Sequence, residues 1–241
     1  MLTIKNVSAT IDNKNLLSNI SIQINSGEIH AILGPRQSGK STLAHLIAGY
    51  PTLDLTEGSI LFNGKNLKTL NAENRAKLGI YVAFQGPPEI GGLTNFELAL
   101  NCLRAKKDKI LEEDILKDYS VLADMLELPS THGNSIIHFD DISPIDMKKN
   151  EILLMLLLEP KLVIIDEIDS SMDENDLEIL GAILSSFSSE KNSIILITHS
   201  RKLLDMVVPT NVHVLVNGEI REQGTTELYK RIIEDGYSQF S

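Results

Sequence analysis

The sequence predicts an α/β fold in which helices cover the faces of a mostly parallel sheet. Several short runs are nearly continuous in Val, Ile and Leu, which is typical of strands buried on both faces of such a sheet. These strand-like runs are residues 28–33, 79–84, 161–166, 192–198 and 211–216. Helix-like stretches alternate with the later ones, at about 39–49, 173–186, 200–206 and 225–235. This alternation favours an α/β sheet with helices on its faces.

An antiparallel flank is predicted beside this core. Residues 1–33 and 57–66 are rich in strand-like runs, and Gly turns interrupt them. The runs in question are 2–7, 20–24 and 59–62.

A helical insertion is predicted in the middle of the chain. Residues 94–158 have no good strand signal and divide into three helix-like stretches, 95–107, 110–128 and 145–160. We therefore predict a single domain over residues 1–241, with an α/β core at 1–90 and 159–241 and a helical subdomain at about 91–158. The tail 234–241 is expected to be the loosely held end.

Charge and cysteine content limit the classes of partner and metal site that this chain can have. The chain has 22 Lys and Arg against 33 Asp and Glu, a formal charge of −11. This balance disfavours a broad nucleic-acid-binding face but leaves room for a local basic pocket. Cys102 is the only cysteine, so neither an internal disulfide nor a Cys-based zinc site can form.

The sequence also suggests where the protein works. The N-terminus does not have the pattern of a signal peptide, and the longest apolar run, 152–158, is too short to span a bilayer. A cytoplasmic protein without direct membrane insertion is expected.

A phosphate-binding loop is predicted at residues 34–42, "GPRQSGKST". It follows the strand 28–33 and opens a helix, which is the context that makes the pattern G-x-x-x-x-G-K-[ST] specific. Backbone N–H groups and the helix N-terminus bind phosphate oxygens, Lys40 reaches the β- and γ-phosphates, and the Ser41 hydroxyl ligates Mg²⁺. The predicted nucleotide-binding residues here are Gly34, Pro35, Arg36, Gln37, Ser38, Gly39, Lys40, Ser41 and Thr42.

Polar residues at the ends of other strands complete the predicted site. The stretch 161–167, "KLVIIDE", is a strand that ends in two carboxylates. Asp166 is expected to hold Mg²⁺, and Glu167 is expected to orient the attacking water. His199 follows the next strand and is predicted to sense the γ-phosphate; Gln85 follows strand 79–84 and is a candidate for Mg²⁺ or water contact. The alternatives are a polar turn for the two carboxylates and a structural role for His199.

These motifs, in this order, resemble the ATP-binding cassette (ABC) ATPases. Three longer segments are similar to the SufC family within them: "GIYVAFQGPPEIGGLT" (79–94), "KKNEILLMLLLEPKLVIIDEIDSSMD" (148–173) and "ITHSRKLLDMVVPTNVHVLVNGEI" (197–220). The resemblance implies a phosphate-loop NTPase with a RecA-like core, an antiparallel β subdomain and an inserted helical subdomain. It also implies an ATPase that uses ATP and Mg²⁺ for iron–sulfur cluster assembly.

The same resemblance implies how such a protein assembles. Two subunits sandwich two ATP molecules between the phosphate loop of one and the signature motif of the other, and a SufB- or SufD-like scaffold is the partner. The dimerising D-loop corresponds to residues 169–173, and the scaffold-binding surface to 85–104. In that surface Pro87, Pro88, Ile90 and Leu93 either contact the scaffold or pack a subdomain hinge.

Two departures from the family pattern stand out. Ile11 occupies the position where many ABC proteins stack an aromatic residue on adenine, so base selectivity is expected to be weak. The family's signature S-G-G-E corresponds to Ser143, Pro144, Ile145 and Asp146, with Asp140 and Asp141 adding negative charge nearby.

The altered signature still suits a helix start. Ser143 is a favourable N-cap, Pro144 a favourable first residue, and Asp146 gives a start like a capping box. The predicted contact of Ser143 with a partner's nucleotide is weakened, because Pro144 has no N–H and Ile145 is bulky. Either this chain completes a partner's site poorly, or Ser143 and the helix dipole suffice. The functional assembly is then either a homodimer or a heterodimer with a SufC-like paralogue.

Lys148 raises one more hypothesis. An ion pair between Lys148 and Glu167 in the monomer would hold the catalytic carboxylate away until dimerisation; alternatively Lys148 is a solvated lysine on a helix face. Two other functions stay open. In the first, the chain is a regulatory subunit that binds nucleotide but hydrolyses ATP poorly. In the second, it is the ATPase subunit of an ABC transporter.

Overall fold

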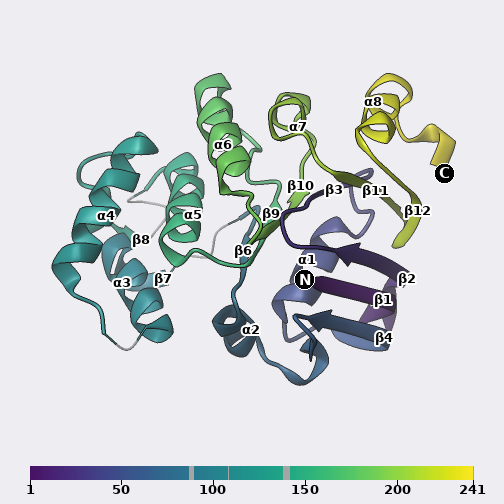
Figure 1. Cartoon of the computed structure of the whole chain (residues 1–241), viewed down its shortest axis with the longest axis horizontal. Helices are drawn as coiled ribbons and strands as arrows, with labels where there is room; N and C mark the ends of the chain where they lie inside the picture. Colours follow the sequence, from purple (N-terminus) through teal and green to yellow (C-terminus); the bar gives the residue numbers. More distant parts are fainter. Residues whose placement is uncertain (87–89, 108, 138–141, 241) are drawn as a thin grey trace.

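The computed structural model describes residues 1–86, 90–107, 109–137 and 142–240. A six-stranded sheet forms the core, with strand order β12-β11-β3-β10-β9-β6 (Figure 1). All neighbours in it are parallel except β12, which runs antiparallel to β11. Its strands are β3 (Ile29–Leu33), β6 (Ile80–Ala83), β9 (Leu162–Asp166), β10 (Ser193–Ile197), β11 (Asn211–Val216) and β12 (Glu219–Gly224). The predicted α/β fold is confirmed.

The antiparallel flank is confirmed as a second sheet with strand order β2-β1-β4-β5. β1 pairs antiparallel with both β2 and β4 through a register that contains bulges. The strands are β1 (Leu2–Ile11), β2 (Lys14–Ile24), β4 (Asp54–Phe62) and β5 (Lys65–Asn66). The 3-10 helix η1 (Leu67–Thr69) follows.

Two apolar layers hold the core sheet, one on each face. Helix α1 (Lys40–Ala48) packs between the core sheet and the antiparallel sheet, where its side chains meet those of β1, β2 and β4. On the other face lie α6 (Glu174–Phe187), α7 (Arg201–Val207) and α8 (Thr226–Asp235), seen along the top of Figure 1. Strands buried on both faces explain why their sequences are apolar at nearly every position.

The helices of the predicted insertion lie together at one end of the molecule (Figure 1). They are α3 (Asn95–Lys106), α4 (Glu112–Met125) and α5 (Pro144–Leu158), accompanied by the short 3-10 helix η2 (His132–Asn134). A small hairpin of β7 (Ile90–Thr94) and β8 (Ile136–Ile137) adjoins them. The predicted limits of the subdomain, at about 91 and 158, stay a prediction.

Three features were not predicted. Helix α2 (Ala72–Leu78) is short and polar, and strand β12 has charged side chains at 219, 221 and 222, so neither gives a strong apolar period. The tail is held more firmly than expected, because Phe240, in the 3-10 helix η3 (Ser238–Phe240), is buried against the core. None of the described helices combines the length and apolar character needed to span a bilayer.

Candidate active site

The phosphate loop adopts a conformation that depends on residues at particular positions. It leaves β3 at Leu33 and enters α1 at Lys40. Gly34 lies against β11, where an added Cβ would come within 2.0 Å of the Leu215 carbonyl oxygen. Gly39 has a φ of 106°, in the left-handed region that glycine accepts without strain. The loop is therefore curled with its backbone N–H groups available to a phosphate at the start of α1.

Lys40 is buried inside the curl of its own loop. Its Nζ donates hydrogen bonds to the carbonyl oxygens of Gly34 (3.1 Å) and Pro35 (2.9 Å) and lies 3.7 Å from Oε1 of Glu167. Burial lowers the pKa of Lys40, although Glu167 and Asp166 oppose that shift. A phosphate anion placed in the loop would add a second countercharge to the one that Glu167 already provides.

A magnesium ion fits beside Ser41 and Asp166. The Ser41 hydroxyl donates to Oδ1 of Asp166 at 3.0 Å, so two hard oxygen ligands already lie side by side. Burial raises the pKa of Asp166, and a bound cation would favour its ionised form. Within the described residues no group of three or more His, Cys, Asp or Glu side chains could hold a metal ion. Phosphate oxygens and water would therefore complete the coordination.

Two of the three predicted catalytic side chains contact the carboxylate of the third, Glu167. Gln85 Nε2 donates to Oε2 of Glu167 at 3.0 Å, and His199 Nε2 lies 3.3 Å from Oε1. Glu167 comes directly after β9, has a φ of 49°, and its N–H donates to the Ile197 carbonyl. Its carboxylate is thus directed toward the phosphate loop from the same sheet edge as His199.

Two buried oxygens near this cluster have no hydrogen-bond partner among the residues that the structure describes. One is Ser38 Oγ, inside the phosphate loop, which is suited to donate to a phosphate oxygen. The other is Oδ1 of Asp169, whose Oδ2 accepts a 2.5 Å hydrogen bond from Thr198. Burial raises the pKa of Asp169. Asp169 belongs to the predicted dimerising segment 169–173, and its side chain lies in the site.

The site opens into two neighbouring cavities. One, of about 660 Å³, contains the catalytic cluster and is lined by Arg36, Gln37, Lys40, Ser41, Gln85, Glu167, Asp169, Ser170 and His199. The second, of about 560 Å³, is lined by Lys14, Asn15, Leu16, Gln37, Gly39, Ser41, Thr42, Asn217 and Gly218. Because Gln37 and Ser41 border both, one elongated ligand can occupy the two cavities.

The second cavity contains residues that sequence reasoning missed. Ile11, the predicted base contact, is half-buried at the end of β1 and does not line this cavity, whereas Leu16 does. Asn217 reaches it from the turn after β11. The turn residues Asn217 and Gly218 were the only local signal, and turns of this kind are common at surfaces. The role of Ile11 stays a prediction, and Leu16 joins it as a candidate.

Helix α5 begins at Pro144, as the sequence predicted. The Ser143 side chain accepts a 3.1 Å hydrogen bond from the Asp146 N–H, which is the N-cap contact. Ser143 does not line either cavity, so its predicted contact is with a second subunit. Asp140 and Asp141, like Pro87 and Pro88, lie outside the described residues.

The predicted ion pair between Lys148 and Glu167 is wrong for this structure. Lys148 Nζ donates to the backbone carbonyl of Ser170 and, at 2.8 Å, to the Ser170 hydroxyl. Glu167 is instead held by Gln85, His199 and Lys40. The reason is that Ser170, three residues beyond Glu167, meets α5, while the Glu167 side chain is directed toward the phosphate loop.

Comparison with known proteins agrees with this geometry. The sequence profile described as "ABC transporter" matches residues 17–170. A relative from Cyanophora paradoxa, "Probable ATP-dependent transporter ycf16", is 42% identical over 98% of this chain and 93% of its own. "Probable ATP-dependent transporter SufC" from Escherichia coli (strain K12) is 37% identical over 98% of this chain and 97% of its own.

Solved structures share the fold. One, described as the ATP binding subunit of an ABC transporter, aligns with a TM-score of 0.85 over 100% of this chain and 99% of its own, at 22% identity. Another is a dimeric ATP-binding cassette in a post-hydrolysis state bound to ADP and Pi. It aligns with a TM-score of 0.81 over 93% of this chain and 98% of its own, also at 22% identity.

Proposed function

This chain belongs to the ABC transporter family, and from that premise we propose how it works. It is an ATP-binding cassette ATPase of the SufC type, with ATP and Mg²⁺ as its ligands. The observation on which the proposed mechanism depends is the convergence of Gln85 and His199 on the Glu167 carboxylate, next to Lys40.

ATP binding rearranges the contacts of Lys40 first. The phosphate loop N–H groups and the Ser38 hydroxyl donate to phosphate oxygens, and Lys40 exchanges its two carbonyl partners for the β- and γ-phosphates. Ser41 and Asp166 would hold Mg²⁺, which would supply positive charge against the charge that develops on the phosphates. Leu16 lines the second cavity, where the nucleoside is expected, and the contact of Ile11 with the base stays a prediction.

Hydrolysis depends on the orientation of one water molecule. Glu167 accepts a hydrogen bond from the attacking water and polarises it for in-line attack on the γ-phosphorus. Gln85 and His199 fix the two oxygens of that carboxylate, and His199 donates to the γ-phosphate once Glu167 turns toward the water. The leaving group is ADP.

Two chains are proposed to close on two nucleotides, with α5 of one facing the phosphate loop of the other. The start of α5 then supplies fewer donors than a glycine-rich signature, because Pro144 has no N–H. A homodimer would have two weakened sites. A heterodimer with a SufC-like paralogue would have one good site, built on this chain's phosphate loop.

We propose a SufB- or SufD-like scaffold in the cytoplasm as the partner that this ATPase drives. The predicted scaffold-binding surface, 85–104, adjoins a mainly apolar cavity of about 170 Å³ between α2, α3 and β6. Tyr81, Cys102 and Ala105 line it together with Lys77 and Lys106. This lining suits an apolar side chain flanked by acidic residues.

Turnover of the purified chain tests the proposed activity. We expect Mg²⁺-dependent ATP hydrolysis that is slow for the chain alone and faster in a mixture with a SufC-like paralogue. Brisk hydrolysis by the chain alone, lost in Glu167→Gln, would contradict the idea that the altered signature impairs it. Nucleotide-dependent dimerisation without any turnover would favour a regulatory subunit instead.

Capture from the native cell extract tests the partner. We expect the wild-type chain to retain a SufB- or SufD-like protein and Ala105→Trp, which fills the apolar cavity, to lose it while keeping its basal hydrolysis. Ala105 is exposed and remote from the catalytic cluster, so this variant isolates docking from chemistry. Retention of an integral membrane protein in place of a soluble scaffold would identify a transporter motor.

A further inference from the structure

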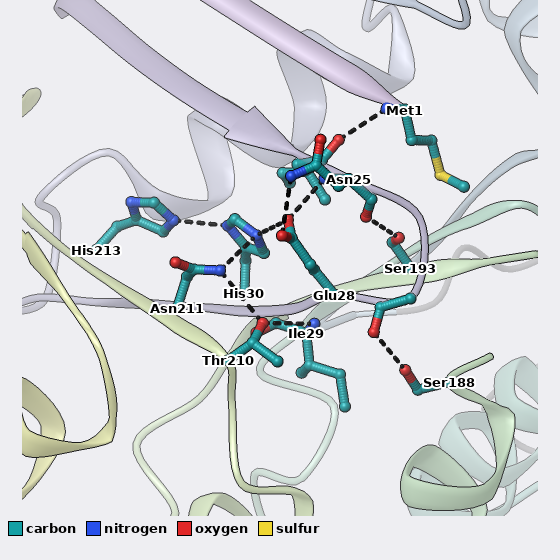
Figure 2. A network of polar contacts seen from close by, with 12 residues as sticks. Met1, Asn25, Glu28, Ile29, His30, Ser188, Ser193, Thr210, Asn211 and His213 are labelled. Carbon is teal, nitrogen blue, oxygen red and sulfur yellow. Dashed lines mark hydrogen bonds and ion pairs between the residues drawn. The ribbon is translucent and has the colours of Figure 1, made fainter. Parts of the chain in front are cut away.

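A pair of histidines is buried between the two sheets, away from the catalytic cluster. His30 lies on β3 and His213 on β11, and their exposed fractions are 1% and 3%. His30 Nδ1 and His213 Nε2 are 2.8 Å apart, a hydrogen bond between residues 183 positions apart in the sequence (Figure 2). The nucleotide mechanism makes no use of either ring.

The surrounding contacts determine where the protons are. Glu28 Oε2 lies 2.9 Å from His30 Nε2, and the Glu28 carboxylate accepts hydrogen bonds from the Asn25 N–H (2.6 Å) and side-chain amide (2.9 Å). Burial raises the pKa of Glu28, but these hydrogen bonds and His30 outweigh it and lower the pKa to about 2. An ionised carboxylate only accepts, so the proton of His30 is on Nε2 and is directed at Glu28. The Asn211 amide nitrogen, 3.1 Å from the same Nε2, then makes no hydrogen bond to it and donates to the Thr210 hydroxyl at 3.3 Å.

The tautomer of His213 follows from that of His30. His30 Nδ1 is then an acceptor, and His213 must donate to it from Nε2. His213 Nδ1 is consequently a bare acceptor, and it is indeed buried without a partner. The three side chains form a directional relay, Glu28–His30–His213, in which each hydrogen bond sets the direction of the next.

The pair stays uncharged near neutral pH because burial lowers the pKa of both rings, although Glu28 opposes that shift for His30. Among the described residues in contact with the two rings, Glu28 is the charged one. Asn211, from β11, and Gln223, from β12, are neutral; the Gln223 amide donates to the Ser21 carbonyl of β2 at 3.0 Å. Burial and the neighbouring His30 lower the pKa of His213 to about 4.

The two strands joined by this pair also hold the phosphate loop. β3 runs from His30 to Leu33 and directly into the loop, a span of about 13 Å at roughly 3.3 Å per residue. β11 is parallel to it, and the turn that follows supports the loop, because the Gly218 N–H donates to the Ser38 carbonyl at 2.8 Å. Gly34 packs against the Leu215 carbonyl. A shift between β3 and β11 would therefore change the shape of the loop.

We propose that Glu28, His30 and His213 are positioning residues of the nucleotide site. Their relay aligns β3 with β11 beneath the phosphate loop and keeps the loop in the shape that binds phosphate. This inference rests on the proposed nucleotide-binding function.

Two substitutions at one position separate the hydrogen bond from the packing. His213→Leu keeps an apolar volume but removes the donor to His30, whereas His213→Gln keeps an amide N–H at the same reach. His132→Leu is the matched control, since His132 is also buried and hydrogen-bonded, to Asn150, but lies in the helical insertion. The measurements are the Kd for Mg-ADP by calorimetry and the urea midpoint of each variant.

We expect His213→Leu to raise the Kd at least fivefold, while His213→Gln stays within twofold of wild type. His132→Leu should lower the urea midpoint without changing the Kd. Equal Kd values for wild type, His213→Leu and His213→Gln would overturn the inference. Absence of binding by the wild-type protein would instead overturn the proposed function.

A spectroscopic measurement on the intact wild type keeps the test decisive if His213→Leu does not fold. In long-range ¹H–¹⁵N spectra both rings should be neutral Nε2–H tautomers at pH 7, and their shifts should move when Mg-ADP is added. A proton on Nδ1 of either ring would contradict the relay. Chemical shifts that do not change when Mg-ADP is added would contradict its link to the nucleotide site.

Discussion

The Ser41 hydroxyl and the Asp166 carboxylate are joined by a 3.0 Å hydrogen bond, although they are 125 positions apart in the sequence. Ser41 lies in the first turn of α1 and Asp166 at the end of β9. This contact brings the two halves of the nucleotide site together at one sheet edge, as is usual for ligand sites of open α/β sheets. It also brings together the two residues that are proposed to hold Mg²⁺.

Asp166→Asn should weaken the use of Mg²⁺. The amide keeps the hydrogen bond to Ser41 but loses the charge, so we expect the Mg²⁺ concentration for half-maximal hydrolysis to rise at least tenfold. Burial raises the pKa of Asp166, so in the metal-free wild type protonation begins at a higher pH than for an ordinary aspartate. Mg²⁺ activation at limiting metal should thus weaken as the pH falls toward 5, and Mg²⁺ titrations at several pH values measure both effects.

Glu167→Gln should stop hydrolysis without preventing binding. The amide can still accept from Gln85, but it cannot act as a general base, a role that contributes about 10²- to 10⁴-fold to rate. We expect kcat to fall by about that factor and the Kd for Mg-ATP to change less than threefold. Glu174→Gln is the control, because Glu174 is an exposed acid on α6 that pairs with Lys202. A variant Glu167→Gln with near-normal kcat would assign the base elsewhere.

Local sequence patterns were sufficient for the core strands and the phosphate loop. The runs around Ile29–Leu33 and Leu162–Asp166 are apolar because both faces are buried, and the loop pattern is specific in its strand–helix context. Strand β12 was missed because the charged side chains of Glu219, Arg221 and Glu222 leave it without a regular apolar alternation at the edge of the sheet.

Contacts between segments that are distant in the sequence were harder to predict from local patterns. The partner of Lys148 depends on how the backbone turns after Glu167, which has a positive φ that its residue type does not indicate. The lining by Leu16, from strand β2, and by Asn217, from the turn after β11, depends on segments that meet only in the folded chain. His30 and His213 were each counted within apolar strands, and their pairing required the β3–β11 register.

Restoring glycines at the start of α5 should speed hydrolysis by the chain alone. In Pro144→Gly/Ile145→Gly the backbone regains an N–H and loses a bulky side chain at the predicted partner site. One or two donors to a phosphate oxyanion are worth about 1.5–3 kcal/mol, so we expect kcat to rise roughly tenfold or more. The control is the urea midpoint, since the variant loses a favourable N1 proline. An unchanged kcat with normal folding would show that the natural signature is adequate.

Arg75→Ala should destabilise the protein strongly. The buried guanidinium donates to four carbonyl oxygens, at Leu46 and Ile47 near the end of α1 and at Leu67 and Leu70. Its removal leaves those acceptors unpaired, and we expect the free energy of unfolding to fall by about 3 kcal/mol. Arg104→Ala is the matched control, because Arg104 is exposed and, within the described part of the chain, forms its ion pair with Glu112 at the surface. The loss there should be below about 1 kcal/mol. Urea unfolding at pH 7.5 measures both.

The buried histidine pair should make stability depend on pH in a defined direction. Burial and His30 lower the pKa of His213 to about 4, against 6.5 for an ordinary histidine. Above pH 6.5 neither the folded nor the unfolded state binds this proton. As the pH falls from 6.5 to 4, the unfolded state takes it up first, so the free energy of unfolding decreases, by about 3 kcal/mol in total.

His213→Gln removes that titration and should flatten the dependence. Urea unfolding of wild type and variant at pH 7.5, 6.5, 5.5 and 4.5 measures how the free energy of unfolding changes with pH. The slopes are compared rather than the absolute stabilities, because the substitution also changes packing. Between pH 6.5 and 4.5 the wild type should lose about 2 kcal/mol more than the variant. Parallel curves would mean that the pKa of His213 is the same in the folded and the unfolded protein, so that burial does not keep this ring neutral below pH 6.5.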